Sequence, residues 1–267
     1  MQDLKILCFQ SDLVWEDPEK NRELFGIKIL NHFEGQDLIM LPETFTTGFP
    51  VDPSGLAETP EGETVRWMSD IARETGAVIT GSLLLEANGK YTNSLIWMRP
   101  DGTYERYDKR HVFSMGGEHE KITPGKKQLI VELKGWRIRP MICYDLRFPV
   151  WCKNRLNETG RYEYDLSLFV ANWPNVRSYP WEQLLIARAI ENLAYVVGLN
   201  RIGHDGPGNY YSGDSLIIDP KGKIISRADE GKERAMSEIL SYNELAEFRK
   251  KFDVGRDWDE FEINLES

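Results

Sequence analysis

Short apolar runs of strand length alternate along this chain with amphipathic segments of helix length. Residues 37–41 (DLIML) and 165–171 (DLSLFVA) are nearly continuous apolar runs, a pattern typical of strands buried on both faces. Both runs lead into a polar loop, which indicates a loose internal symmetry. Helical periodicity covers 21–33, 64–75 and 180–192. The alternation predicts an α/β fold, with one mixed sheet or two packed sheets and the helices outside.

Three turn signals join neighbouring strands, at 100–102 (PDG), 134–135 (KG) and 219–222 (DPKG). No linker or low-complexity block interrupts the chain, so residues 1–267 are expected to form one domain. From about residue 250 the chain is aromatic and acidic, and it forms either a flexible tail or an arm that packs on a partner subunit. The remaining expected strands cover residues 4–9, 77–85, 93–98, 103–107, 129–133, 137–142, 194–200, 215–218 and 223–226.

The composition argues against several classes of protein. The formal net charge of −10 disfavours general binding to nucleic acid or to an anionic membrane, because that binding needs clustered Lys and Arg. No run approaches the roughly 18 apolar residues of a transmembrane helix, and the first residues lack a signal-peptide pattern. Three cysteines in a chain of this length do not suggest a disulfide framework, so the cytoplasm is the expected location.

The segment 139–149 (RPMICYDLRFP) places Cys143 at the end of an expected strand, just before an expected helix start. Such a turn exposes the side chain and directs backbone N–H groups toward it, which would lower the pKa of a thiol and could hold an oxyanion. A single free cysteine is nevertheless more often a small buried hydrophobe. Cys8 and Cys152 are interpreted as such buried residues. Cys8 lies within a strand pattern, and Cys152 lies one helical turn into the segment that follows.

A thiol nucleophile normally needs a base. None of the four histidines has a strong strand-end position, although His111 and His119 share a loop and remain candidates. Glu43 follows the apolar run 37–41 after a proline, and burial beside neighbours such as Phe45 would raise its pKa toward neutrality. Taken alone, Glu43 fits a solvated loop residue equally well.

Two further charged residues could complete such a site. Lys109 follows the expected strand 103–107 and could favour a thiolate and then bind an oxyanion. Glu118 lies in a glycine-containing loop and could orient Lys109. Each also fits an exposed charge when taken alone.

These segments together resemble the nitrilase superfamily, the carbon–nitrogen hydrolases. The resemblance runs in order through nearly the whole chain. It implies a four-layer α-β-β-α sandwich, no cofactor or metal, and subunits paired into a homodimer or a larger homo-oligomer. The motifs that carry it are LPETFTTGF, YDKRHVF, ICYDLRFP, ANWP, ARAIENLAYVVGLNRIG and GDSLIIDPKGKI.

The resemblance also implies a Glu–Lys–Cys triad. Glu43 would be the general base and acid, Lys109 would stabilise the tetrahedral intermediates, and Cys143 would be the nucleophile. Glu118 matches the auxiliary glutamate of the family. The backbone N–H of Tyr144 would complete the oxyanion hole.

Within this superfamily, LPETFTTGF, KRHVFSMGGEHEKITPG and CYDLRFPVW look most like the omega-amidases, which act on the terminal amide of 2-oxo acid amides such as 2-oxoglutaramate or 2-oxosuccinamate. Arg147 suits the substrate carboxylate, since a guanidinium binds it with two hydrogen bonds; a structural ion pair is the equal alternative. Four residues either line a slot beside the thiol or belong to the core: Phe45, Phe113, Met115 and Trp173.

Three alternatives remain at this level. The chain could belong to the same superfamily and act on nitriles, carbamoyl amides or other small amides. It could be a papain-like hydrolase that uses His111 or His119, in which case Glu43→Gln would cost little activity. It could be a binding protein without catalysis, which selective labelling of Cys143 by a thiol-reactive substrate analogue would contradict.

Overall fold

A computed structural model describes residues 2–264, which contain two six-stranded sheets and a short hairpin. The first sheet has the order β14-β1-β2-β3-β4-β5. Its three inner strands β1, β2 and β3 are parallel, and the flanking strands are antiparallel to their neighbours. The strands are β1 (Leu4–Gln10), β2 (Leu38–Met40), β3 (Val78–Ala87), β4 (Lys90–Met98), β5 (Tyr104–Asp108) and β14 (Arg234–Leu240).

The second sheet repeats this plan in the order β13-β12-β9-β8-β7-β6. Strands β7, β8 and β9 are parallel, and the others are antiparallel to their neighbours. The strands are β6 (Val131–Leu133), β7 (Trp136–Ile142), β8 (Leu166–Ala171), β9 (Tyr195–Asn200), β12 (Leu216–Ile218) and β13 (Ile224–Arg227). The predicted internal symmetry is confirmed, because 37–41 and 165–171 supply β2 and β8, the middle strands of the two parallel triplets.

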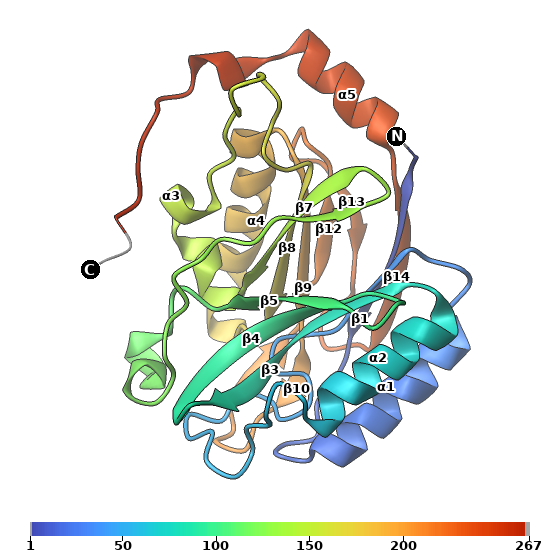
Figure 1. The fold of residues 1–267 in the computed structure, drawn as a ribbon, viewed down its shortest axis with the longest axis vertical. Helices are drawn as coiled ribbons and strands as arrows, with labels where there is room; N and C mark the ends of the chain where they lie inside the picture. The colour runs from blue at the N-terminus through green and yellow to red at the C-terminus, as the bar shows by residue number, and fades with distance from the viewer. Residues whose placement is uncertain (1, 265–267) are drawn as a thin grey trace.

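The two sheets pack face to face because successive side chains of a strand point to opposite faces of its sheet, and both faces are apolar. In β1, Leu4 and Ile6 belong to the core between the sheets, whereas Leu7 and Phe9 belong to a second core beneath the helices. This second core includes apolar residues of α1 (Pro18–His32) and α2 (Glu63–Thr75). In Figure 1 these two helices lie together on one outer side of the sheets.

The other outer side carries α4 (Ser178–Asn192), which buries Trp181, Leu185 and Ala189 against the second sheet. Together these layers confirm the α-β-β-α sandwich, and the described residues contain no helix that could cross a membrane. Four further elements were not predicted from the sequence: β14, the hairpin strands β10 (Ile202–His204) and β11 (Tyr210–Ser212), and α5 (Tyr242–Lys251). The remaining α-helix among the described residues is the short α3 (Pro149–Cys152).

The C-terminal segment after α5 runs across the loop that follows α3 (Figure 1). The ammonium of Lys153 lies 3.6 Å from the ring centroid of Trp258, and the Arg155 guanidinium lies 4.5 Å from that of Phe261. Tyr162 donates a hydrogen bond to Asp253. The described part of this segment therefore packs on its own chain, and an additional contact with a partner subunit remains a prediction.

Candidate active site

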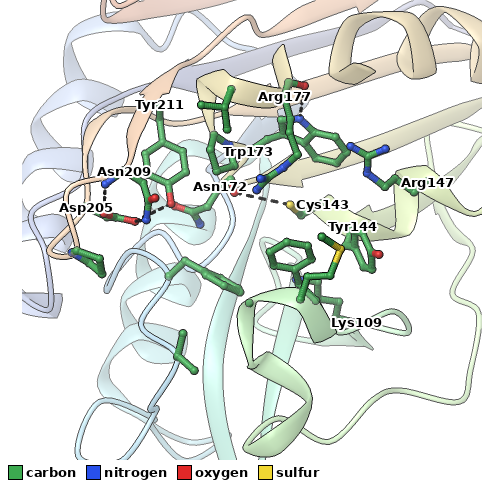
Figure 2. A pocket seen from close by; sticks show the side chains of 18 residues that line it. Lys109, Cys143, Tyr144, Arg147, Asn172, Trp173, Arg177, Asp205, Asn209 and Tyr211 are labelled. Atoms are coloured by element: carbon green, nitrogen blue, oxygen red, sulfur yellow. Dashed lines mark hydrogen bonds between the residues drawn. The ribbon is translucent and has the colours of Figure 1, made fainter. Parts of the chain in front are cut away.

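The loops after β2, β5, β7 and β8 meet at one end of the sandwich. Glu43 follows β2, Lys109 directly follows β5, and Cys143 directly follows β7. Lys109 and Cys143 line a cavity of about 330 Å³ (Figure 2). We call Glu43, Lys109, Glu118 and Cys143 the buried cluster, since none is more than 8% exposed.

Glu43 is held by hydrogen bonds to both of its carboxylate oxygens. Oε1 accepts bonds of 2.8 Å from Lys109 Nζ and from Asn93 Nδ2, and Oε2 accepts a 2.7 Å bond from the backbone N–H of Asn172. The Asn172 side chain also donates to the Glu43 carbonyl oxygen and to Thr44 Oγ1. The loops after β2 and β8 thus tie the two sheets together at the carboxylate.

Lys109 links this carboxylate to a second one. Its ammonium lies 3.1 and 3.0 Å from the two carboxylate oxygens of Glu118, which begins a short 3₁₀ turn. Burial alone would lower the pKa of Lys109, but the negative charges of Glu118 and Glu43 raise it above its usual value. Lys109 is therefore a protonated, fixed cation. Burial also raises the pKa of Glu118, although Lys109 opposes that rise.

Cys143 adopts a left-handed backbone conformation, with φ of +43°, at the turn from β7 into the 3₁₀ segment Cys143–Arg147. Such a conformation is uncommon for a residue with a Cβ and is typical of nucleophile turns. Its Sγ lies 3.9 Å from the carbonyl oxygen of Asn172. The sequence suggested that this turn would expose the Cys143 side chain and lower its pKa. The pKa is instead raised well above its usual value by burial and by the charge of Glu43, although Lys109 opposes that rise.

Asp145 fixes the turn that follows the nucleophile. It accepts hydrogen bonds from Tyr107 Oη at 2.7 Å and from the backbone N–H of Ile142 at 3.1 Å. The backbone N–H of His111 also donates to it, and the His111 ring nitrogen Nδ1 lies 2.8 Å from the same carboxylate. His111 therefore belongs to a structural network behind the turn. His119 is exposed, and neither histidine lines the cavity, which disfavours the papain-like alternative.

The cavity brings together most of the remaining residues that the sequence singled out. Phe113, Met115, Tyr144, Arg147 and Trp173 all line it, as Figure 2 shows for those that it labels. The Arg147 guanidinium lies 4.8 Å from the ring centroid of Trp173, and no acidic side chain in the described part of the chain pairs with it. The structural ion pair considered for Arg147 is thus not found there.

Phe45 lies elsewhere, because Thr44 has a φ of +41° and the chain reverses after Glu43. The Phe45 ring is fully buried and packs against Phe25 and Trp67 in the core beneath the helices. It does not line the cavity. Its assignment to a slot beside the thiol is therefore corrected to a core position.

Several residues that line the cavity were not singled out from the sequence. Asn172 sits directly after β8, where a polar strand-end residue could have been noticed. Asp205, Asn209 and Tyr211 come from the missed hairpin, and Arg177 ends the short 3₁₀ turn Asn175–Arg177 that leads into α4. Within residues 2–264, no group of three His, Cys, Asp or Glu side chains is arranged to hold a metal ion.

Comparison with known proteins places this geometry in a family. The family model described as "Carbon-nitrogen hydrolase" matches residues 8–250. The omega-amidase YafV of Escherichia coli K12 is 44% identical over 98% of this chain and 100% of its own length. A 2-oxoglutaramate amidase of Bacillus subtilis is 31% identical over 93% of this chain and 96% of its own.

Solved structures agree with this result. The crystal structure of XC1258 from Xanthomonas campestris is described as a CN-hydrolase superfamily protein with an arsenic adduct in the active site. It superposes with a TM-score of 0.96 at 44% identity, over 99% of this chain and 100% of that one. The structure of Nit3 from Saccharomyces cerevisiae matches with a TM-score of 0.80 at 23% identity and covers 94% of both chains, which shows a common fold.

Proposed function

The chain belongs to the carbon–nitrogen hydrolase family, and on that premise we propose that it is an omega-amidase. Its substrate would be a small 2-oxo acid amide of the 2-oxoglutaramate or 2-oxosuccinamate type, and its products the 2-oxo dicarboxylate and ammonia. The observation that carries the proposal is the buried cluster beside a cavity that also holds an arginine without an acidic partner. The relatives named omega-amidase and 2-oxoglutaramate amidase support the same substrate class.

In the first half of the reaction, Cys143 Sγ forms a bond to the amide carbon while its proton passes to Glu43. The carbonyl electron pair moves to oxygen, and the resulting oxyanion is held by Lys109 and by the backbone N–H of Tyr144. Glu43 then gives the proton to the nitrogen, the carbon–nitrogen bond breaks, and ammonia leaves. The acyl group remains on Cys143 as a thioester.

In the second half, water attacks the thioester carbon and gives a proton to Glu43. The carbon–sulfur bond breaks, and the departing sulfur recovers the proton from Glu43. The raised pKa of Cys143 suits this scheme, because the sulfur is a protonated thiol at rest and needs a base for each attack. Glu118 keeps Lys109 in place through both halves.

Arg147 is proposed to bind the substrate carboxylate. Its guanidinium has no acidic partner among the described residues, and the face of Trp173 orients it. A guanidinium and a carboxylate form two parallel hydrogen bonds, and this geometry would direct the opposite end of the substrate toward Cys143. Phe113, Met115 and Trp173 would contact the methylene groups of the substrate.

We further propose that the protein forms a homodimer through the α4 side of the sandwich. Large apolar side chains are exposed on α4 and in the turn before it: Val176, Tyr179 and Ile190 are each more than half exposed. Apolar surface gathered in one region favours contact with another protein surface. Light scattering coupled to size-exclusion chromatography would test this proposal, and a mass near 30.9 kDa would contradict it.

The direct test of the function is ammonia release from a panel of amides. The panel contains 2-oxoglutaramate, 2-oxosuccinamate, glutamine, N-carbamoyl amino acids and simple nitriles. The two 2-oxo acid amides should give the highest kcat/KM. If another member of the panel is preferred by tenfold or more, the omega-amidase assignment is wrong, whatever the roles of the buried cluster.

A further inference from the structure

Trp173 organises two arginines on one wall of the cavity. Its indole Nε1–H donates a 2.7 Å hydrogen bond to the backbone carbonyl oxygen of Arg177, which fixes the backbone from which that side chain extends. The Trp173 ring contacts the other arginine, because its centroid lies 4.8 Å from the Arg147 guanidinium. In Figure 2, Trp173 lies between the two arginine side chains, and Arg177 points into the cavity.

The Arg177 side chain reaches across the cavity toward the nucleophile turn. Its guanidinium lies 5.3 Å from the ring centroid of Phe113, on the loop that carries Glu118. Phe113 in turn packs edge to face on Tyr144, with ring centroids 5.1 Å apart, and Tyr144 is the residue after Cys143. Arg177 is therefore held beside the reaction centre by aromatic contacts rather than by a salt bridge.

The charges that line the cavity are unequally paired. Lys109 is engaged by two glutamates, and Asp205 accepts hydrogen bonds from Asn209 and from Tyr211 Oη. Arg147 and Arg177 have no acidic partner among the described residues. Figure 2 shows Asp205 grouped with Asn209 and Tyr211 on one side of the cavity and Arg147 on the other. The wall around Trp173 is thus locally positive.

A single carboxylate needs only one guanidinium for a two-hydrogen-bond contact, so the second arginine calls for a second acceptor on the ligand. Guanidinium groups donate hydrogen bonds and cannot accept them. A 2-oxo acid amide supplies the additional acceptor, because its carbonyl oxygen lies next to its carboxylate. A 2-amino acid amide such as glutamine presents an ammonium at the same carbon, which a guanidinium repels.

We infer that Arg177 is a specificity-determining residue, which binds the 2-oxo group and rejects amides that carry an ammonium at that carbon. The inference rests on the proposed omega-amidase function and deepens it, because it assigns the choice between 2-oxo and 2-amino substrates to one side chain. Arg147 then recognises the carboxylate that both substrate types share, and Arg177 distinguishes between them.

The test compares wild type, Arg177→Gln, Arg177→Lys and Arg147→Gln on four amides. These are 2-oxoglutaramate, glutaramate without a substituent at that carbon, glutamine, and the uncharged pentanamide. In Arg177→Gln, the preference for 2-oxoglutaramate over both glutaramate and glutamine should fall about 10- to 100-fold, the range of one hydrogen bond to a charged group. Arg177→Lys should retain much of the discrimination against glutamine, because it keeps the positive charge.

Arg147→Gln should instead lower kcat/KM for all three carboxylates by similar factors. Arg73→Gln, an exposed arginine on α2 outside the cavity, is the control, and thermal denaturation checks that each variant is folded. If Arg177→Gln lowers kcat/KM equally for all four amides, or leaves the substrate preferences unchanged, the inference is wrong. A wild-type enzyme without a preference for 2-oxoglutaramate over glutamine would instead overturn the proposed function, and the wild-type panel alone reveals this.

Discussion

The buried cluster and the outer part of the cavity are built in opposite ways. In the buried cluster, each carboxylate has at least two hydrogen-bond donors, and Lys109 bridges Glu43 and Glu118. The outer part, which we call the mouth and define as Met115, Arg147, Val176 and Arg177, has exposed apolar side chains and unpaired arginines. Met115 and Val176 are each 84% exposed.

The difference separates two tasks. A fully hydrogen-bonded cluster in a low-dielectric interior holds its groups in one geometry, which suits a reaction that moves a single proton between fixed atoms. Unpaired cations at a partly solvated mouth remain available to an anionic ligand. Substitutions in the buried cluster should therefore affect chemistry and stability together, whereas substitutions at the mouth should affect substrate choice.

The largest effect is expected from Lys109→Met, which leaves Glu43 and Glu118 buried without their shared cation. Loss of a buried partner typically costs about 3–5 kcal/mol of stability, and loss of an oxyanion donor costs about 10²–10³-fold in kcat. Urea denaturation and single-turnover kinetics measure the two effects. Lys126→Met, at an exposed lysine, is the control. A stable Lys109→Met variant with near-normal kcat would contradict the division between cluster and mouth.

Arg147→Gln should have a smaller and more selective effect. We expect kcat/KM for 2-oxoglutaramate to fall about 10- to 100-fold, since one charge-assisted contact is lost, while pentanamide hydrolysis changes little. Steady-state kinetics on both amides measures the ratio. Equal losses on the two substrates would show that Arg147 supports the cavity structure instead of binding the carboxylate.

Met115→Ala should have the smallest effect. The side chain is exposed, so stability should change by no more than about 0.5 kcal/mol. We expect kcat/KM to change less than about threefold for every amide, because Met115 offers the substrate only dispersion contacts. A loss above tenfold on all substrates would mean that the mouth closes over the ligand and buries this methionine during the reaction.

Much of the sandwich could be predicted from the sequence, because β2 and β8 are nearly pure apolar runs with clear strand-end residues. Strand β14 could not, since it lies at the edge of the first sheet and its two charged residues, Arg234 and Glu238, alternate with buried Met236 and Leu240 on the same face. Its pairing with β1 joins the two ends of the chain. Such long-range pairing leaves little trace in local periodicity.

The residues that meet in the buried cluster were predicted by combining strand-end positions with a family resemblance. The raised pKa of the Cys143 thiol could not be predicted, because its burial and its closeness to the charge of Glu43 arise only when the sheets pack. Phe45 was misplaced because the left-handed turn at Thr44 redirects the chain. Arg177 escaped notice because its position depends on a hydrogen bond from Trp173 to its backbone.

In the proposed mechanism, the protonated Cys143 thiol depends on Glu43 as its base. The most direct measurement follows Glu43→Gln with two readouts, 2-oxoglutaramate hydrolysis and modification of Cys143 by methyl methanethiosulfonate across pH 6–10. Cys143→Ala supplies the background, since burial raises the pKa of Cys152 to about 12 and also raises that of Cys8.

In the wild type, modification should still accelerate above pH 9, because the thiolate is the reactive form and the pKa of Cys143 is raised. In Glu43→Gln, a charge that raises this pKa is removed while Lys109 remains. Modification near pH 7 should therefore become faster, whereas kcat falls about 10²–10⁴-fold. Retained hydrolysis, or a modification rate that falls together with hydrolysis, would contradict the claim that Glu43 is the base.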